Sequence, residues 1–126
     1  MLQLVPILAS LSLAATFPKS EVKIIGPIDY GQTSPAVHYR NPPKYRAFGF
    51  NARPGDHVEI WVHARQGSPE AFLTDSAFTS IAGGNARFSA TIPQDSKPAT
   101  YYIVFRDMKS NSGNFTVELQ RPYAAR

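Results

Sequence analysis

The sequence contains no cysteine and no run of three basic residues. Structural disulfides, thiolate metal sites and cysteine nucleophiles are therefore excluded. The thirteen Lys and Arg residues, against nine Asp and Glu, spread from Lys19 to Arg126. Proteins that bind nucleic acid usually concentrate positive charge on one face or helix. The formal net charge of +4 therefore predicts a solvated basic surface and no nucleic-acid partner.

Long helical patterns are also missing. The eleven prolines and eight glycines are scattered along the chain, an arrangement that favours short strands joined by turns over long helices. A chain of 126 residues with 43% hydrophobic content predicts a single folded domain with one core rather than a disordered chain.

The first fifteen residues carry no charged side chain and end in small residues, with Ser12-Leu13-Ala14 as a small-x-small site. This pattern predicts a secretory signal peptide, cleaved after Ala14 or Ala15. We therefore expect a leader at 1–15, one domain at 16–122, a tail at 123–126, and export to the periplasm or beyond. The stretch is shorter than the roughly 20 residues that a spanning helix needs. The alternative is a retained leader, packed as a strand or anchor on the domain or on a neighbour.

Apolar residues alternate from Glu21 onward, the period that places every second side chain on one face of a strand. Turn residues punctuate this pattern at 53–56, 66–69, 83–85 and 110–113. Seven to eight short strands at such spacing predict an all-β fold, an antiparallel, jelly-roll-like β-sandwich. The expected strands lie at 22–25, 36–39, 46–52, 57–64, 71–75, 88–92, 100–107 and 114–120.

The alternation also predicts the core. Its inward side chains are expected to be Phe48, Phe50, Val58, Ile60, Val62, Tyr101, Ile103, Phe105, Phe115, Val117 and Leu119.

One stretch resembles a known family. The run FGFNARPGDHVEI from Phe48 to Ile60 is similar to the opening of bacterial pre-peptidase C-terminal (PPC) domains. Segments 92–93, 100–105 and 113–119 match the family's last part, and 67–75 with 82–84 match its middle more loosely. The resemblance implies a jelly-roll-like sandwich of exported bacterial proteins, often appended to enzymes and seldom catalytic. Some relatives bind calcium through acidic residues near the N-terminus, where this chain has only Glu21 and Asp29.

No catalytic or metal-binding constellation is visible. The sequence has no Gly-x-Ser-x-Gly elbow. His57 and His63 share one strand face but lie about 20 Å apart at the rise of a strand, too far to share a metal. His57 and Glu59 alone would make a two-ligand site, which is poor for a metal. We therefore expect no enzymatic activity, no metal and no cofactor.

Trp61 is the most informative residue. If Val58, Ile60 and Val62 face the core, Trp61 faces outward in a row with His57, Glu59 and His63. An exposed tryptophan can anchor a protein interface or stack on a sugar ring. Alternatively, Trp61 packs under the proline-rich segment 29–44.

Two residues of the strand at 100–107 could enlarge this surface. Tyr102 and Val104 are expected to face outward, and they would extend the Trp61 patch if the strand order allows it. The leading hypothesis is a binding or assembly module with a protein partner, as a subunit of an envelope or extracellular complex. The second is a carbohydrate-binding module that uses Trp61 and its strand neighbours.

Overall fold

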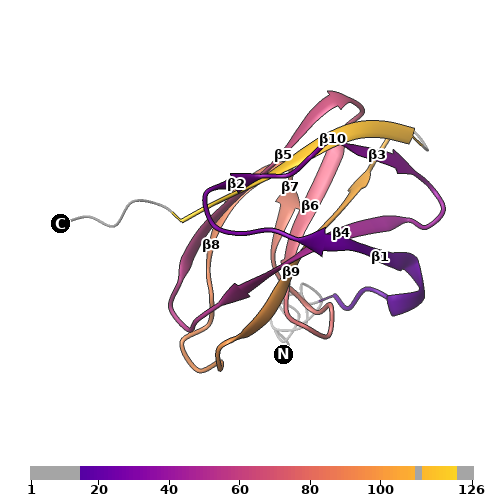
Figure 1. Cartoon of the computed structure of the whole chain (residues 1–126). Coiled ribbons are helices and arrows are strands. Elements are labelled where there is room, and N and C mark those ends of the chain that lie inside the picture. The colour runs from indigo at the N-terminus through magenta and orange to yellow at the C-terminus, as the bar shows by residue number, and fades with distance from the viewer. Residues whose placement is uncertain (1–14, 110–111, 122–126) are drawn as a thin grey trace, which may run out of the picture.

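The computed structural model describes residues 15–109 and 112–121. Residues 1–14 of the predicted leader and 123–126 of the predicted tail lie outside the described residues. The described chain is built from strands and one short 3-10 turn, η1 (Lys19–Glu21) (Figure 1). Its strands are β1 (Val22–Pro27), β2 (Gln32–Thr33), β3 (Val37–Arg40), β4 (Tyr45–Ala52), β5 (His57–Gln66), β6 (Pro69–Thr74), β7 (Ser80–Asn85), β8 (Arg87–Thr91), β9 (Ala99–Asp107) and β10 (Ser112–Gln120).

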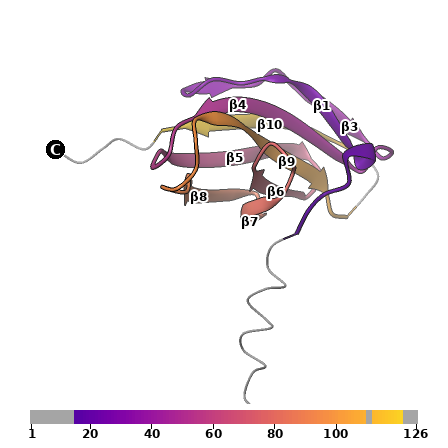
Figure 2. The ribbon, with the colours of Figure 1, turned by 90° about the horizontal axis from the view of Figure 1, so that it is seen from below.

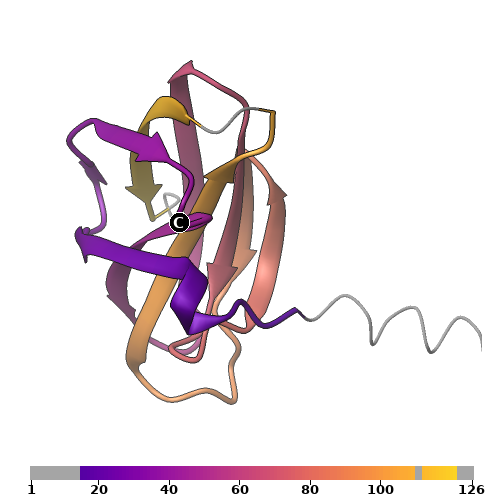
Figure 3. The same ribbon diagram turned by 90° about the vertical axis from the view of Figure 1, so that its right-hand side faces the viewer.

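The strands form two five-stranded sheets, which confirms the predicted β-sandwich. The first, the β9 sheet, has the order β1-β4-β9-β6-β7. The second, the β5 sheet, has the order β2-β10-β5-β8, and β3 also pairs with β10. Figure 2 shows β1 along one edge beside β4, and Figure 3 shows β10 next to β3.

The expected strand count and direction need two corrections. The prediction allowed seven to eight strands, whereas the described chain has ten, because β2 is only two residues long and β7 contains the Gly83-Gly84 pair. Among the strands of the described residues, all pairings are antiparallel except one: β1 runs parallel to β4. The eight strands that the alternation predicted are all present, with ends that differ by at most two residues.

The core lies between the two sheets and contains every residue predicted for it. All eleven of these side chains are at most 4% exposed. Phe105 is at its centre, with its ring 6.0 Å from that of Phe115 in an edge-on contact and 6.3 Å from that of Phe48 in a stacked one. The strong alternation of β4, β5, β9 and β10 therefore encodes which face of each strand is buried.

A second apolar cluster covers the outer face of the β9 sheet. Val104, predicted to face solvent, is fully buried there. Phe17 and Phe78 pack over it, held by hydrogen bonds from Phe17 N to Phe78 O (2.9 Å) and from Ser80 N to Ala15 O (2.7 Å). The outward prediction for Val104 is wrong because the chain's own N-terminal segment covers this sheet face.

The predicted turn at 83–85 is also wrong. Gly83 and Gly84 lie within β7, and the pairing with β6 shifts register between Ala71 and Phe72. Gly83 has a φ of +132°, and a Cβ there would lie 2.5 Å from the carbonyl oxygen of Ala71. The glycines therefore allow the backbone of the irregular strand β7 to lie close to that of β6. The chain bends after the strand, at Ala86.

Candidate binding face

The four outward residues predicted on β5 share the outer face of the β5 sheet. The residues that alternate with them, Val58, Ile60 and Val62, are each at most 1% exposed and point to the core. The strand order places β5 between β8 and β10. Trp61 therefore lies opposite Arg87 of β8 and Glu118 of β10.

Trp61 is partly open to solvent. Its exposed fraction is 36%, so it is not packed beneath segment 29–44. The Arg87 guanidinium lies 4.2 Å from the centre of the indole, and the His63 ring lies 4.0 Å from it at an interplanar angle of 31°. These contacts hold the indole in place while part of it stays in contact with water.

Ion pairs and hydrogen bonds surround the indole. Arg87 donates from Nε (3.1 Å) and Nη2 (2.9 Å) to Oε2 of Glu59. His63 Nε2 lies 2.8 Å from Oε1 of Glu118. Hydrogen bonds from His63 and then from Gln120 lower the pKa of Glu118, so its carboxylate stays ionised.

His57 lies at the far end of the row, where its Nδ1 is 2.9 Å from the hydroxyl of Thr91. We call this surface the Trp61 face and define it by His57, Glu59, Trp61, His63, Arg87 and Glu118.

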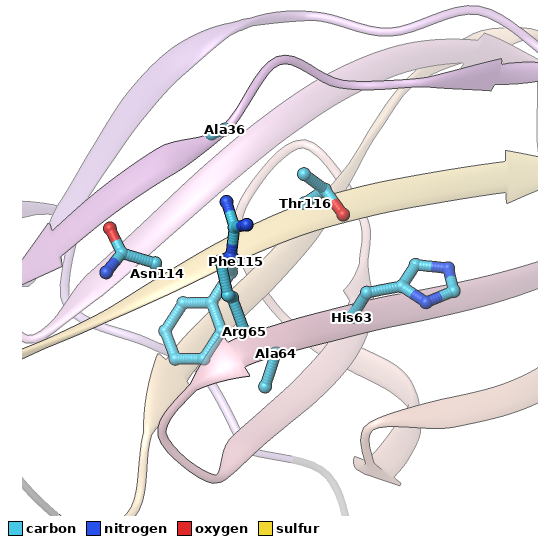
Figure 4. Close-up of a pocket in the computed structure, with 7 residues that line it drawn as sticks. All are labelled: Ala36, His63, Ala64, Arg65, Asn114, Phe115 and Thr116. Atoms are coloured by element: carbon cyan, nitrogen blue, oxygen red, sulfur yellow. The ribbon is translucent and has the colours of Figure 1, made fainter.

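A hollow of about 510 Å³ lies at the end of this face, where β5 meets β10. We call it the Arg65 hollow, after the guanidinium that extends from β5 toward Ala36 in Figure 4. It is lined by Arg65, His63, Ala36, Asn114, Phe115 and Thr116, among others. Because His63 belongs to both, the hollow continues the Trp61 face.

Tyr102 does not join the other predicted site residues. It lies on β9 in the opposite sheet. Its ring packs against Phe78 at 4.9 Å and against the cluster that covers the outer face of that sheet. The structure therefore brings His57, Glu59, Trp61 and His63 together and separates Tyr102 from them.

Three residues of the surface were missed in the sequence. Arg87 and Glu118 become neighbours of Trp61 only through the register of β8 and β10 on β5. Arg65 is displaced by a bulge, since Ala64 pairs with Phe115 and Gln66 with Asn114. The alternation of 114–120 indicated that Glu118 faces outward, whereas Arg87 lies just before the expected strand at 88–92. Neither pattern gave a sign of which strands would be adjacent.

Other site types find little support in the described residues. In 15–109 and 112–121, no three His, Asp or Glu side chains gather into a group that could hold a metal ion. Over the same ranges, no helix has the length and apolar character needed to cross a membrane.

Comparison with known proteins supports the fold. No protein-family model matches the chain, and no curated protein matches it in sequence. Among solved structures, the pre-peptidase C-terminal domain of a collagenase from Bacillus anthracis superposes with a TM-score of 0.52 at 16% identity, over 83% of this chain and 100% of that domain. PliG from Aeromonas hydrophila, a periplasmic inhibitor of g-type lysozyme, gives 0.52 at 12% identity, over 79% and 99%. Likeness at such low identity concerns architecture alone: the chain has a β-sandwich fold of the pre-peptidase C-terminal type.

Proposed function

We propose that this protein is a non-catalytic binding module that works outside the cytoplasm and meets a protein partner with the Trp61 face. The observation that carries the proposal is the partly exposed indole of Trp61, held by Arg87 and His63 at the centre of a sheet face. Tryptophan and arginine are enriched among the residues that dominate interface energies. An anchor that is already ordered loses less entropy on binding than a mobile one.

The polar side chains around Trp61 fit the same role. Glu59, Arg87, His63 and Glu118 are paired with one another, so a partner can cover them without leaving an isolated buried charge. A polar, hydrogen-bonded rim around an aromatic anchor is the usual anatomy of a protein interface.

Sugar binding is the weaker alternative. Stacking on a sugar needs an open ring face, whereas a guanidinium and an imidazole already lie about 4 Å from the indole. A glycan panel titrated against Trp61 fluorescence tests this alternative directly. A saturable shift with any polysaccharide would favour it over a protein partner.

Export is supported by the fold and by the start of the domain. The neighbours include a periplasmic inhibitor that acts on another protein and a domain of a collagenase. Ala15 O and Phe17 N form the first backbone hydrogen bonds of the described residues. Cleavage after Ala14 would leave both in place, so the proposed processing site is compatible with the folded domain. Mass spectrometry of the native protein should then find an N-terminus near Ala15 or Thr16, and an intact Met1 would contradict cleavage.

The function is tested by capture from the native cell envelope on immobilised protein. We expect a specific protein to be retained by the wild type and lost with Trp61→Ala. Met108→Ala is the matched control, because Met108 is another exposed apolar side chain (48%) and follows β9 of the opposite sheet. Thermal melting establishes that the variants are folded. Equal capture by the wild type and by folded Trp61→Ala would refute the role of this face.

A further inference from the structure

We infer that the Arg65 hollow is a carboxylate subsite, which receives an aspartate or glutamate side chain from an acidic segment of the protein partner. The inference rests on the proposed function, because it takes the partner to be a protein that covers the adjoining Trp61 face.

The backbone of β5 gives Arg65 its position. Ala64 pairs with Phe115 and Gln66 pairs with Asn114, so Arg65 is the extra residue of a bulge and has no cross-strand partner. Bulges re-aim side chains and recur beside functional sites. Arg65 itself is exposed, and its guanidinium extends along the hollow (Figure 4).

The charge of Arg65 is uncompensated. On the same face Arg87 pairs with Glu59 and His63 pairs with Glu118. Arg65, in contrast, has no ion pair or hydrogen bond from its side chain to any described residue. A guanidinium offers a planar fork of donors that matches a carboxylate. An acidic group of the partner would therefore supply the missing counter-charge.

The walls of the hollow suit the same ligand. The amide of Asn114 is already engaged, with its Oδ1 3.0 Å from His38 Nδ1 and its Nδ2 3.4 Å from Gln66 Oε1. The hydroxyl of Thr116 has no hydrogen-bond partner among the described side chains, which leaves a second donor beside Arg65. Ala36, Ala64 and Phe115 complete the lining, and a less polar wall strengthens a charge-assisted hydrogen bond.

An acidic protein segment fits this site better than a nucleic acid does. Nucleic-acid affinity grows with the number of phosphates that basic residues neutralise. On the Trp61 face, Arg87 and His63 are already paired with Glu59 and Glu118, so neither cation is left over for a run of phosphates. A single unpaired guanidinium matches a single carboxylate.

The test uses the full chain, an octaglutamate peptide as probe, and two-dimensional ¹H–¹⁵N NMR. We expect the largest shifts on the backbone amides of Arg65, Gln66, Asn114 and Thr116. Arg65→Gln should raise the Kd for the peptide at least tenfold. The Kd of Arg65→Lys should lie between those of Arg65→Gln and the wild type. Lys23→Gln removes an equal charge from an exposed position on β1 and should change the Kd for the peptide less than twofold.

Several outcomes would overturn the inference. The first is an NMR titration with no shifts, or with shifts spread over the whole basic surface. The second is an equal loss of octaglutamate affinity in Arg65→Gln and Lys23→Gln. The third is an eight-nucleotide oligothymidylate that binds at the hollow as tightly as octaglutamate does. Retained dispersion of the NMR spectrum establishes that each variant is folded.

Partner capture separates this inference from the proposed function. If Trp61→Ala loses the captured protein while Arg65→Gln keeps it, the carboxylate subsite is refuted and the binding face stands. If octaglutamate binds at the hollow but no captured protein depends on Trp61, the proposed function fails and the carboxylate site stands.

Discussion

The Arg87 guanidinium lies 4.2 Å from the centre of the Trp61 indole while it donates two hydrogen bonds to Glu59. One cation on β8 thus covers part of the indole and ties its own strand to β5. Because Arg87 is more than half exposed, its contact with Trp61 shields the indole from solvent but adds little to the stability of the fold.

Replacement of Arg87 should therefore uncover Trp61 with little loss of stability. In Arg87→Ala, we expect stronger quenching of tryptophan fluorescence by acrylamide, because a covering group is gone. The free energy of unfolding should fall by less than about 1 kcal/mol, the range of exposed ion pairs and cation–π contacts. Arg106→Ala breaks the Arg106–Glu70 pair of the opposite sheet and should leave the quenching unchanged. The same quenching constant in wild type and Arg87→Ala would contradict the observed contact.

The core should depend heavily on Phe105. This side chain is fully buried and contacts Phe48 and Phe115, so Phe105→Ala leaves a cavity where the two sheets meet. We expect a loss of about 3–5 kcal/mol in the free energy of unfolding, measured by urea denaturation. Ser89→Ala, on the exposed side of β8, should stay within about 0.5 kcal/mol of the wild type. An unchanged midpoint for Phe105→Ala would mean that the inward face of β9 is misassigned.

The parts of the fold that sequence could predict are those that depend on local alternation. A period of two fixes which side of β5 or β9 is inward without knowledge of their neighbours. It cannot fix what covers the outer side. Val104 has the pattern of a solvent-facing residue, yet Phe17, nearly ninety positions earlier in the sequence, packs against the same cluster. Such long-range cover has no local signal.

Phe17 should accordingly stabilise the domain through this second cluster. Its ring lies 4.8 Å from that of Tyr45 and 5.1 Å from that of Phe72. Because Phe17→Ala uncovers the outer face of the β9 sheet, we expect a loss of about 3 kcal/mol in urea denaturation. Lys19→Ala changes an exposed residue of η1 and serves as the control. Equal stability of the two variants would show that the N-terminal segment does not hold this cluster together.

Gly83 should not tolerate a side chain. Its φ of +132° is unfavourable for other residues, and a Cβ would lie 2.5 Å from Ala71 O and 2.6 Å from Phe72 Cα. We expect Gly83→Ala to cost at least about 2 kcal/mol in thermal or urea unfolding, as strained positions do. Gly26→Ala is the matched control, because a Cβ there meets nothing within 4 Å. A neutral Gly83→Ala would refute the close approach of β7 to β6.

The candidate site was predictable to the same extent as the fold. The outward row of His57, Glu59, Trp61 and His63 follows from the alternation of one strand. The contacts of Trp61 with Arg87, and of His63 with Glu118, depend on the order of strands and their register. Tyr102 was grouped with Trp61 because both face outward, but alternation cannot tell one sheet's outer face from the other's.

Tyr30 should make the stability of the domain depend on pH in the alkaline range. The Tyr30 hydroxyl donates to Oδ2 of Asp56 at 3.0 Å. Burial, together with this hydrogen bond and the charge of Asp56, raises the pKa of Tyr30 from 10.0 to about 12. The folded protein thus holds this proton more tightly than the unfolded chain does. The stabilisation is fully present below pH 10 and is lost as the pH rises toward 12.

Tyr30→Phe should therefore differ from the wild type in a pH-dependent way. Near pH 8 the variant should be less stable by about 1–2 kcal/mol, because it lacks a hydrogen bond to a carboxylate. Between pH 10 and 12 this difference should shrink, since only the wild type then loses the contribution of Tyr30. Urea denaturation at a series of pH values measures both. Asp56→Asn removes the charge that contributes to the raised pKa of Tyr30, so its own alkaline loss should be smaller than that of the wild type and should level off at a lower pH. A constant difference between wild type and Tyr30→Phe from pH 8 to 12 would contradict the coupling, because it would mean that the folded state does not hold the Tyr30 proton more tightly.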